Sequence, residues 1–297
     1  MRVAALDQGT NTTRLLVADV EGGALREVVR RSTITRLGEG VDRRKRLLPL
    51  PIARVRNVLG EYRRELESLG AERALLVATS AVRDAENGEA FLGEIEWSYG
   101  FATELLTGEE EARLTYRGVG VDDALVLDVG GGSTELVTAE SALSVELGSV
   151  RMSERFGEDV DAIAAHAQEL LPRDLHPERV IGVAATITTL AALDLGLPDY
   201  DRERVHGHTL TFDAVQEQLA RLAALPLEER RRVPALEPER APVIVAGATI
   251  VREAMRALDV ENLEVSERDI LDGAALAAAE LPAPEEGAAP TGAYTCC

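Results

Sequence analysis

The residues best suited to chemistry lie in the stretch ALVLDVGGGSTELV, which runs from position 124 to 137. An apolar run ends in a carboxylate, three glycines follow, and a second carboxylate leads into another apolar run. Glycines let the chain turn sharply and bring backbone N–H groups close to a phosphate. The pattern predicts two buried strands joined by a phosphate-binding turn, although a plain β-hairpin with a glycine loop is the alternative. The residues of interest here are Asp128, Gly130, Gly131, Gly132, Ser133 and Glu135.

The same pattern occurs near the N-terminus in the stretch LDQGTNTTRL. When Asp7 is aligned with Asp128, Gly9 falls on Gly130, and the hydroxyl residues and apolar runs that follow also coincide. Such long-range similarity predicts two related halves, and two turns facing across a cleft would grip one phosphate chain from both sides. The repeat therefore favours a phosphate site over a plain hairpin. The first turn is expected to hold phosphate through Gly9, Thr10 and Asn11.

Two further candidates follow from the elements that must position these turns. The apolar run 74–78 predicts a buried strand, and Arg83 follows at its carboxyl end, where ligands of α/β sheets collect. We expect Arg83 to bind phosphate, with a surface pair to Asp84 as the alternative. In the next predicted helix Thr107 and Glu110 have capping-box spacing, which explains the first acids of this helix but not Glu111.

The remaining pattern predicts an α/β chain of two domains. Domain I would comprise 1–118 plus about 267–281, and domain II 119–266, with a disordered, Pro- and Ala-rich tail over 282–297. Ser266 is expected to cap the returning helix. Other expected elements are a hairpin over 2–19, a strand pair over 25–37, helices over 52–69 and 89–100, and a strand over 179–184 that leads into a helix.

Two clusters have competing interpretations. The run from Arg43 to Arg46 is more simply a solvated loop than a positive lip that guides a long anion, because charge runs are usually exposed. His206 and His208 are spaced like ligands on one strand face. We favour a structural pair over a zinc site, since zinc needs three or four ligands.

Composition limits the classes of partner. The 297 residues carry a net charge of −20, which argues against non-specific nucleic-acid binding and requires arginines or a divalent cation at any phosphate site. No run approaches the roughly 18 to 20 apolar residues of a membrane span, and no cleavable leader is recognisable. A cytoplasmic protein is expected, with the terminal Cys296 and Cys297 as a dispensable tail.

With these motifs in view, the chain resembles the exopolyphosphatase and guanosine pentaphosphate phosphohydrolase (Ppx/GppA) family of the actin-like superfamily. The resemblance extends from about Arg2 to Leu281 and corresponds to the short, two-domain form. It implies two ribonuclease-H-like domains flanking a central cleft. The stretches that carry it are LDQGTNTTRLLVAD, ITRLGEGVD, TSAVRDAEN, TGEEEAR, LVLDVGGGSTELV, GSVRMSERF, VHGHTLT and VSERDILDGA.

The resemblance also implies roles for matching residues. Glu111 matches the catalytic glutamate, Asp128 and Glu135 match the acids associated with magnesium and the attacking water, and Arg83 matches a phosphate-binding residue. One departure is Ala185, where relatives usually carry glycine. Because its Cβ hinders close backbone approach, phosphate contact or a nucleotide pocket at this loop is not expected.

Taken together, we expect hydrolysis of the terminal phosphate of inorganic polyphosphate. Mg²⁺, or another divalent cation such as Mn²⁺, would be held near Asp7, Asp128 and Glu135, and Glu111 would accept the proton of water, with Glu135 in reserve. The alternatives are hydrolysis of guanosine pentaphosphate (pppGpp), a kinase, and a catalytically silent sensor of polyphosphate or alarmone. Neither nucleic acid nor membrane is an expected partner, and the oligomeric state, a homodimer included, is left open.

Overall fold

The computed structural model describes residues 1–282, so the expected disordered tail, except its first residue, lies outside the described residues. Contacts divide the chain into two compact units. Unit 1 contains Met1–Gly118 and the segment that begins at Ile270, and unit 2 contains Val119–Asp269. Each unit has its own sheet and its own hydrophobic core.

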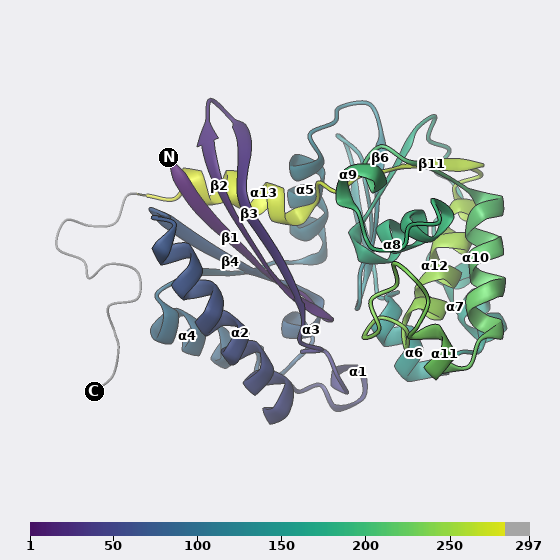
Figure 1. Cartoon of the computed structure of the whole chain (residues 1–297), viewed down its shortest axis with the longest axis horizontal. Coiled ribbons are helices and arrows are strands. Elements are labelled where there is room, and N and C mark those ends of the chain that lie inside the picture. Colours follow the sequence, from purple (N-terminus) through teal and green to yellow (C-terminus); the bar gives the residue numbers. More distant parts are fainter. Residues whose placement is uncertain (283–297) are drawn as a thin grey trace. The chain divides into compact units, whose positions relative to one another are not determined.

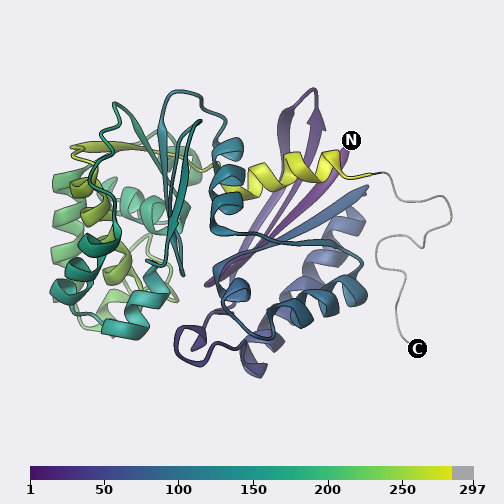
Figure 2. The same ribbon diagram turned by 180° about the vertical axis from the view of Figure 1, so that it is seen from behind.

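Unit 1 is built on a five-stranded mixed sheet of order β3-β2-β1-β4-β5. Helices α2 and α4 cover one face, where apolar side chains from β1, β2 and β4 meet theirs, and α13 covers the other (Figure 1). Helix α5 lies beside α13, and the two approach so closely that a Cβ at Gly273 would lie 2.0 Å from the Leu114 carbonyl (Figure 2). The elements are β1 (Arg2–Gln8), β2 (Thr12–Glu21), β3 (Ala24–Ile34), α1 (Val41–Arg44), α2 (Pro49–Ser68), β4 (Arg73–Ala78), α3 (Ser80–Arg83), α4 (Gly88–Tyr99), β5 (Ala102–Leu105), α5 (Gly108–Val119) and α13 (Ile270–Glu280).

Unit 2 contains a six-stranded mixed sheet of order β10-β11-β9-β6-β7-β8, whose apolar side chains join those of the surrounding helices in one large core. Its elements are β6 (Leu125–Val129), β7 (Thr134–Val137), β8 (Ala142–Val145), α6 (Ser149–Phe156), α7 (Val160–Leu170), β9 (Val180–Val183), α8 (Ala184–Asp194), α9 (Arg202–Val205), β10 (Thr209–Thr211), α10 (Phe212–Ala224), α11 (Leu227–Arg230), α12 (Ile244–Ala257) and β11 (Asn262–Val265).

The two sheets repeat one topology. Read from β8, the order β8-β7-β6-β9-β11 of unit 2 matches β3-β2-β1-β4-β5 of unit 1, and β10 is an addition at the edge. In both units the first strand pairs antiparallel with the second and parallel with the fourth. The prediction of an α/β protein with two related domains is confirmed.

Some element boundaries differ from those expected. Residues 25–37 do not form a strand pair: β3 is one strand that pairs with β2 along its whole length. His206 ends α9 and does not lie on a strand, and it shares no strand face with His208. The returning helix α13 begins at Ile270 rather than Glu267.

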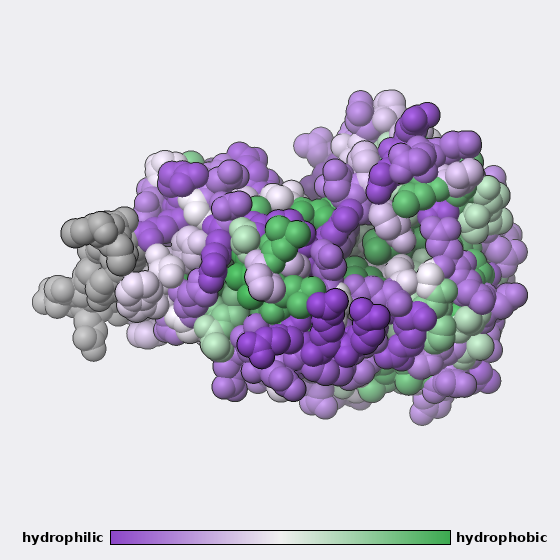
Figure 3. Space-filling model, turned by 90° about the horizontal axis from the view of Figure 1, so that it is seen from below, coloured by the Kyte–Doolittle hydropathy of each residue, from purple (hydrophilic) through white to green (hydrophobic). Residues whose placement is uncertain are grey.

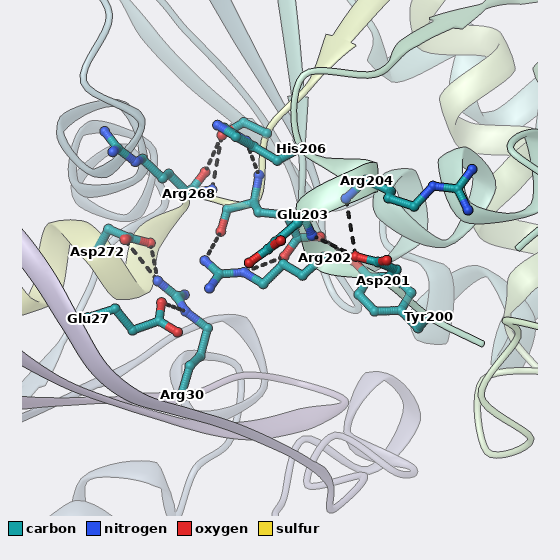
Figure 4. Close-up of polar contacts among 12 residues, drawn as sticks. Glu27, Arg30, Tyr200, Asp201, Arg202, Glu203, Arg204, His206, Arg268 and Asp272 are labelled. Carbon is teal, nitrogen blue, oxygen red and sulfur yellow. Dashed lines mark hydrogen bonds and ion pairs between the residues drawn. The ribbon is translucent and has the colours of Figure 1, made fainter.

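The late start of α13 follows from contacts that hold the segment before it. The Ser266 hydroxyl accepts the Arg268 N–H at 3.0 Å, forming a tight turn instead of a helix cap. Arg202 binds the Glu267 carboxylate at 2.9 Å, the Tyr200 hydroxyl donates to it, and His206 Nδ1 accepts the Glu267 N–H (Figure 4). Burial raises the pKa of Glu267 despite these partners. The segment is thus held within unit 2 until the chain enters unit 1.

Candidate active site

The first glycine turn in unit 1 joins β1 to β2 and is closed by backbone hydrogen bonds. The Gly9 N–H donates to the Thr12 carbonyl at 3.0 Å. The carbonyl of Thr10 accepts the Gly38 N–H at 2.8 Å, and the carbonyl of Asn11 accepts two N–H groups that follow β3. The turn is therefore fixed from outside by the segment after β3, and its residues Thr10 and Asn11 are buried.

The second turn, between β6 and β7 in unit 2, has the same construction. The Gly130 N–H donates to the Ser133 carbonyl, again at 3.0 Å. The segment after β8 supports this turn: a Cβ at Gly148 would lie 2.4 Å from the backbone of Gly131 and Gly132, and the buried Arg151 donates from Nε to the Gly132 carbonyl at 2.7 Å. The repeated sequence pattern thus produces a repeated backbone structure.

The carboxylates at the two turns have different surroundings. Asp7 lies opposite Arg14 on the neighbouring strand, and Arg14 contacts one carboxylate oxygen of Asp7 through Nε at 2.8 Å and Nη2 at 2.7 Å. At the equivalent place in unit 2, Asp128 lies opposite Glu135. Directly opposed residues share a face of the sheet, so this pair places two buried acids side by side where unit 1 has an acid and a base.

This difference bears on which acids could hold a metal ion. Among the described residues no group of three or more His, Cys, Asp or Glu side chains forms a ready metal cage. Magnesium is commonly held by one or two carboxylates together with substrate phosphates and water, which the Asp128–Glu135 pair fits. The charge of Asp7 is already compensated by Arg14. Ser144 donates to Glu135 at 2.7 Å and fixes its carboxylate.

Arg83 and Glu111 come together in unit 1, at the carboxyl ends of β4 and β5. Arg83 Nη1 lies 3.0 Å from Glu111 Oε2 and donates to the Leu106 carbonyl at 2.8 Å. The side chain of Glu111 is only 12% exposed. The preceding capping box forms as predicted: Thr107 donates its backbone N–H and its hydroxyl to Glu110, which lowers the pKa of Glu110. Glu110 therefore caps the helix through Thr107, whereas Glu111 forms an ion pair with Arg83.

Helix α8 of unit 2 begins at Ala184, directly after β9, so Ala185 lies in its first turn rather than in a loop. Ala184 has a φ of 67°, a left-handed conformation that is strained for a residue with a Cβ. Thr186 lies beside α12, where a Cβ at Gly247 would meet its methyl group at 2.6 Å and Ser149 at 3.3 Å. Thr186 thus packs against α12 next to Ser149, the first residue of α6, and Ala185 beside it is half-buried.

Sequence reasoning missed the role of two residues. Arg14 aligns with Glu135 when the two turns are superposed, so the repeat already contained the signal that its partner acid is neutralised. Gly148 opens the stretch GSVRMSERF, but its close contact with the second turn depends on tertiary packing, which the sequence alone does not show.

The two histidines have separate partners. His206 accepts the Glu267 N–H, and His208 Nε2 lies 2.6 Å from Asp194.

The described part of the chain contains no helix long and apolar enough to cross a membrane.

Similarity to known proteins agrees with these features. The chain is 38% identical to exopolyphosphatase 2 of Mycobacterium tuberculosis, over 94% of this chain and 98% of that protein. It is 30% identical to guanosine-5′-triphosphate,3′-diphosphate pyrophosphatase of Aeromonas salmonicida, over 91% of this chain and 58% of that protein. The crystal structure of the Aquifex aeolicus member of the Ppx/GppA protein family superposes with a TM-score of 0.76 at 30% identity, covering 93% of this chain and 97% of that one. The model of the Ppx/GppA phosphatase family matches residues 16–279, and the chain belongs to this family.

Proposed function

We propose that the protein is an exopolyphosphatase, which releases orthophosphate from the end of inorganic polyphosphate by hydrolysis. The similarity to exopolyphosphatase 2 over nearly the whole of both chains supports this substrate. The two fixed glycine turns support binding of phosphate, because such turns direct backbone N–H groups at anions. That both turns and Glu111 act on one substrate remains a prediction from the sequence repeat.

Each site residue has a role in this proposal. Gly9, Thr10 and Asn11 of the first turn, and Gly130 to Ser133 of the second, bind phosphate oxygens. Asp128 and Glu135 are the principal candidates to hold Mg²⁺ or Mn²⁺. Asp7 would contribute only if its carboxylate bound the ion and Arg14 together. When bound, such an ion neutralises phosphate charge and polarises the phosphoryl group.

Glu111 is the proposed general base. Its carboxylate accepts a proton from the attacking water while the water oxygen forms a bond to the terminal phosphorus. The bridging P–O bond breaks, and its electron pair remains on the shortened chain. Arg83 holds this carboxylate in one orientation, and its charge is available to phosphate. Glu135 is the reserve candidate for the base, although its contact with Ser144 and its position opposite Asp128 suit the binding of a cation better.

The observation that carries this assignment is the nearly buried, ion-paired Glu111. Glu111→Gln removes the proton acceptor but keeps the shape, and is expected to lower kcat by about 10²–10⁴-fold while polyphosphate binding persists. Glu109→Gln, on an exposed neighbour, is the matched control and should retain wild-type kcat. The kcat of both variants is measured from phosphate release on polyphosphates of graded length, with and without Mg²⁺. Wild-type kcat in Glu111→Gln would refute the assignment.

Hydrolysis of pppGpp is the second candidate, and the similarity to the Aeromonas salmonicida enzyme is the observation in its favour. It would use the same acids and differ in what holds the rest of the substrate. Ala185, at the place where relatives usually carry glycine, favours a substrate without a base. A competition assay with both substrates distinguishes the two, and tight binding without phosphate release would indicate a sensor instead.

A further inference from the structure

Four consecutive basic side chains in unit 1 have no hydrogen-bond or ion-pair partner within residues 1–282. Arg43, Arg44, Lys45 and Arg46 are all exposed, and within the described residues none of their side chains makes a hydrogen bond or an ion pair. Exposed arginines nearby are paired, as Arg56 is with Glu94. Four adjacent bases repel one another, and no ion pair within the described residues offsets this repulsion, although the chain as a whole carries a net charge of −20.

The loop that carries these bases, residues 38–48 with the short helix α1 within it, is firmly attached to unit 1. Val41 and Leu47, on either side of the cluster, are buried in the core. The Lys45 backbone has a φ of 52°, and its carbonyl accepts the Glu86 N–H at 2.8 Å. Asn87 bonds both the N–H and the carbonyl of Leu47, at 2.8 and 3.1 Å. The bases are thus presented by a fixed backbone rather than by a loose loop.

Both ends of this loop are hydrogen-bonded to segments that contain residues proposed to bind phosphate. At its start, Gly38 donates to the Thr10 carbonyl of the first turn, and a Cβ at Gly38 would lie 2.3 Å from the Thr10 methyl group. At its end, Asn87 lies four residues after Arg83. Figure 3 views the side of the molecule where α1 lies in Figure 1, and strongly hydrophilic residues gather on this face.

We infer that Arg43, Arg44, Lys45 and Arg46 form a second anion subsite, which binds a part of the polyphosphate chain away from the reacting end. This inference rests on the proposed function. A chain carrying a charge at every phosphate offers repeated contacts to a row of bases, and each contact releases counterions. The stretch GEGVDRRKRLL, over 38–48, contains no aromatic side chain on which a nucleobase could stack, which favours an inorganic chain over a nucleic acid.

The test compares a long polyphosphate of about a hundred phosphates with tripolyphosphate. The variant replaces all four bases by glutamine. The control replaces four other exposed arginines of unit 1, Arg26, Arg31, Arg56 and Arg64, so that the net charge changes equally. In the subsite variant, the ratio of kcat/KM on the long chain to kcat/KM on tripolyphosphate should fall about tenfold or more, and the salt dependence on the long chain should flatten. The control should keep the wild-type ratio.

Each other outcome contradicts the inference. An equal fall in the ratio for both variants would show only a general charge effect, and an unchanged ratio in the subsite variant would remove the subsite. If single-stranded RNA competed at this loop as well as polyphosphate at equal charge concentration, the ligand would be a nucleic acid. The double variant Arg43→Gln, Arg44→Gln should lower the kcat/KM ratio less than the fourfold variant does. Equal melting temperatures of the variants and the wild-type protein verify folding. Absence of phosphate release by the wild-type protein from either substrate would instead refute the proposed function.

Discussion

At the scale of single residues, the Arg83–Glu111 pair links two roles that the sequence suggests separately. Arg83 donates to the Leu106 carbonyl and contacts Glu111, so its guanidinium is oriented by two fixed acceptors. A planar guanidinium can satisfy both and still offer donors to a phosphate, which an ammonium group cannot do in the same geometry. Arg83 is therefore a positioning residue for the proposed base as well as a candidate phosphate ligand.

This dual role predicts a particular kinetic result for Arg83→Gln. Loss of orientation at Glu111 should lower kcat by about tenfold to a hundredfold, because small misplacements of reacting groups are costly. If Arg83 served substrate binding alone, its replacement would raise KM and leave kcat unchanged. Arg83→Lys, which keeps the charge but loses the fork, should recover KM more than kcat. Steady-state kinetics on polyphosphate separate these outcomes, and an unaltered kcat in Arg83→Gln would exclude the positioning role.

At the scale of elements, the turns depend on segments distant in sequence. The second turn is supported by the segment that begins at Gly148, whose backbone packs directly on Gly131 and Gly132. The first turn is held in the same way by the segment after β3. The segment that follows the third strand of each unit therefore fixes the shape of the glycine turn as much as the glycines themselves do.

Gly148→Ala tests this dependence. The added Cβ would lie 2.4 Å from the turn backbone, which must move, so activity should fall about tenfold or more and the melting temperature should drop. Gly93→Ala, at an exposed position of helix α4 with no atom within 4 Å of the new Cβ, is the matched control. It should be stabilising by about 0.5–1 kcal/mol with normal activity. Assays of both variants decide, and full activity in Gly148→Ala would show that the turn does not need this support.

Some parts of this fold are determined by local sequence patterns and others by distant contacts. The capping box at Thr107 and both glycine turns were predictable, because their hydrogen bonds join residues only three positions apart. The extended course of β3 and the late start of α13 were not, because each depends on a distant partner: β2 for the strand, and Tyr200 and Arg202 for Glu267. The positive φ of Ala184 likewise has no signal in the residue type.

At the scale of the whole molecule, duplication produced two similar units with unlike charges. The same strand order recurs, but Arg14 neutralises the acid of unit 1, whereas Glu135 doubles the acid of unit 2. In a chain with a net charge of −20, we propose that the basic residues of unit 1 serve to bind anions and the acids of unit 2 serve to bind a cation. Hydrolysis of a polyanion needs both kinds of site.

The proposed attack of water on the terminal phosphorus is tested by hydrolysis of polyphosphate in ¹⁸O-enriched water, with mass analysis of the released phosphate. Attack of water on the terminal phosphorus predicts one solvent oxygen in each orthophosphate released from a chain end, at a rate that collapses in Glu111→Gln. Released phosphate without solvent oxygen, or transfer of the phosphoryl group to an acceptor other than water, would contradict the account.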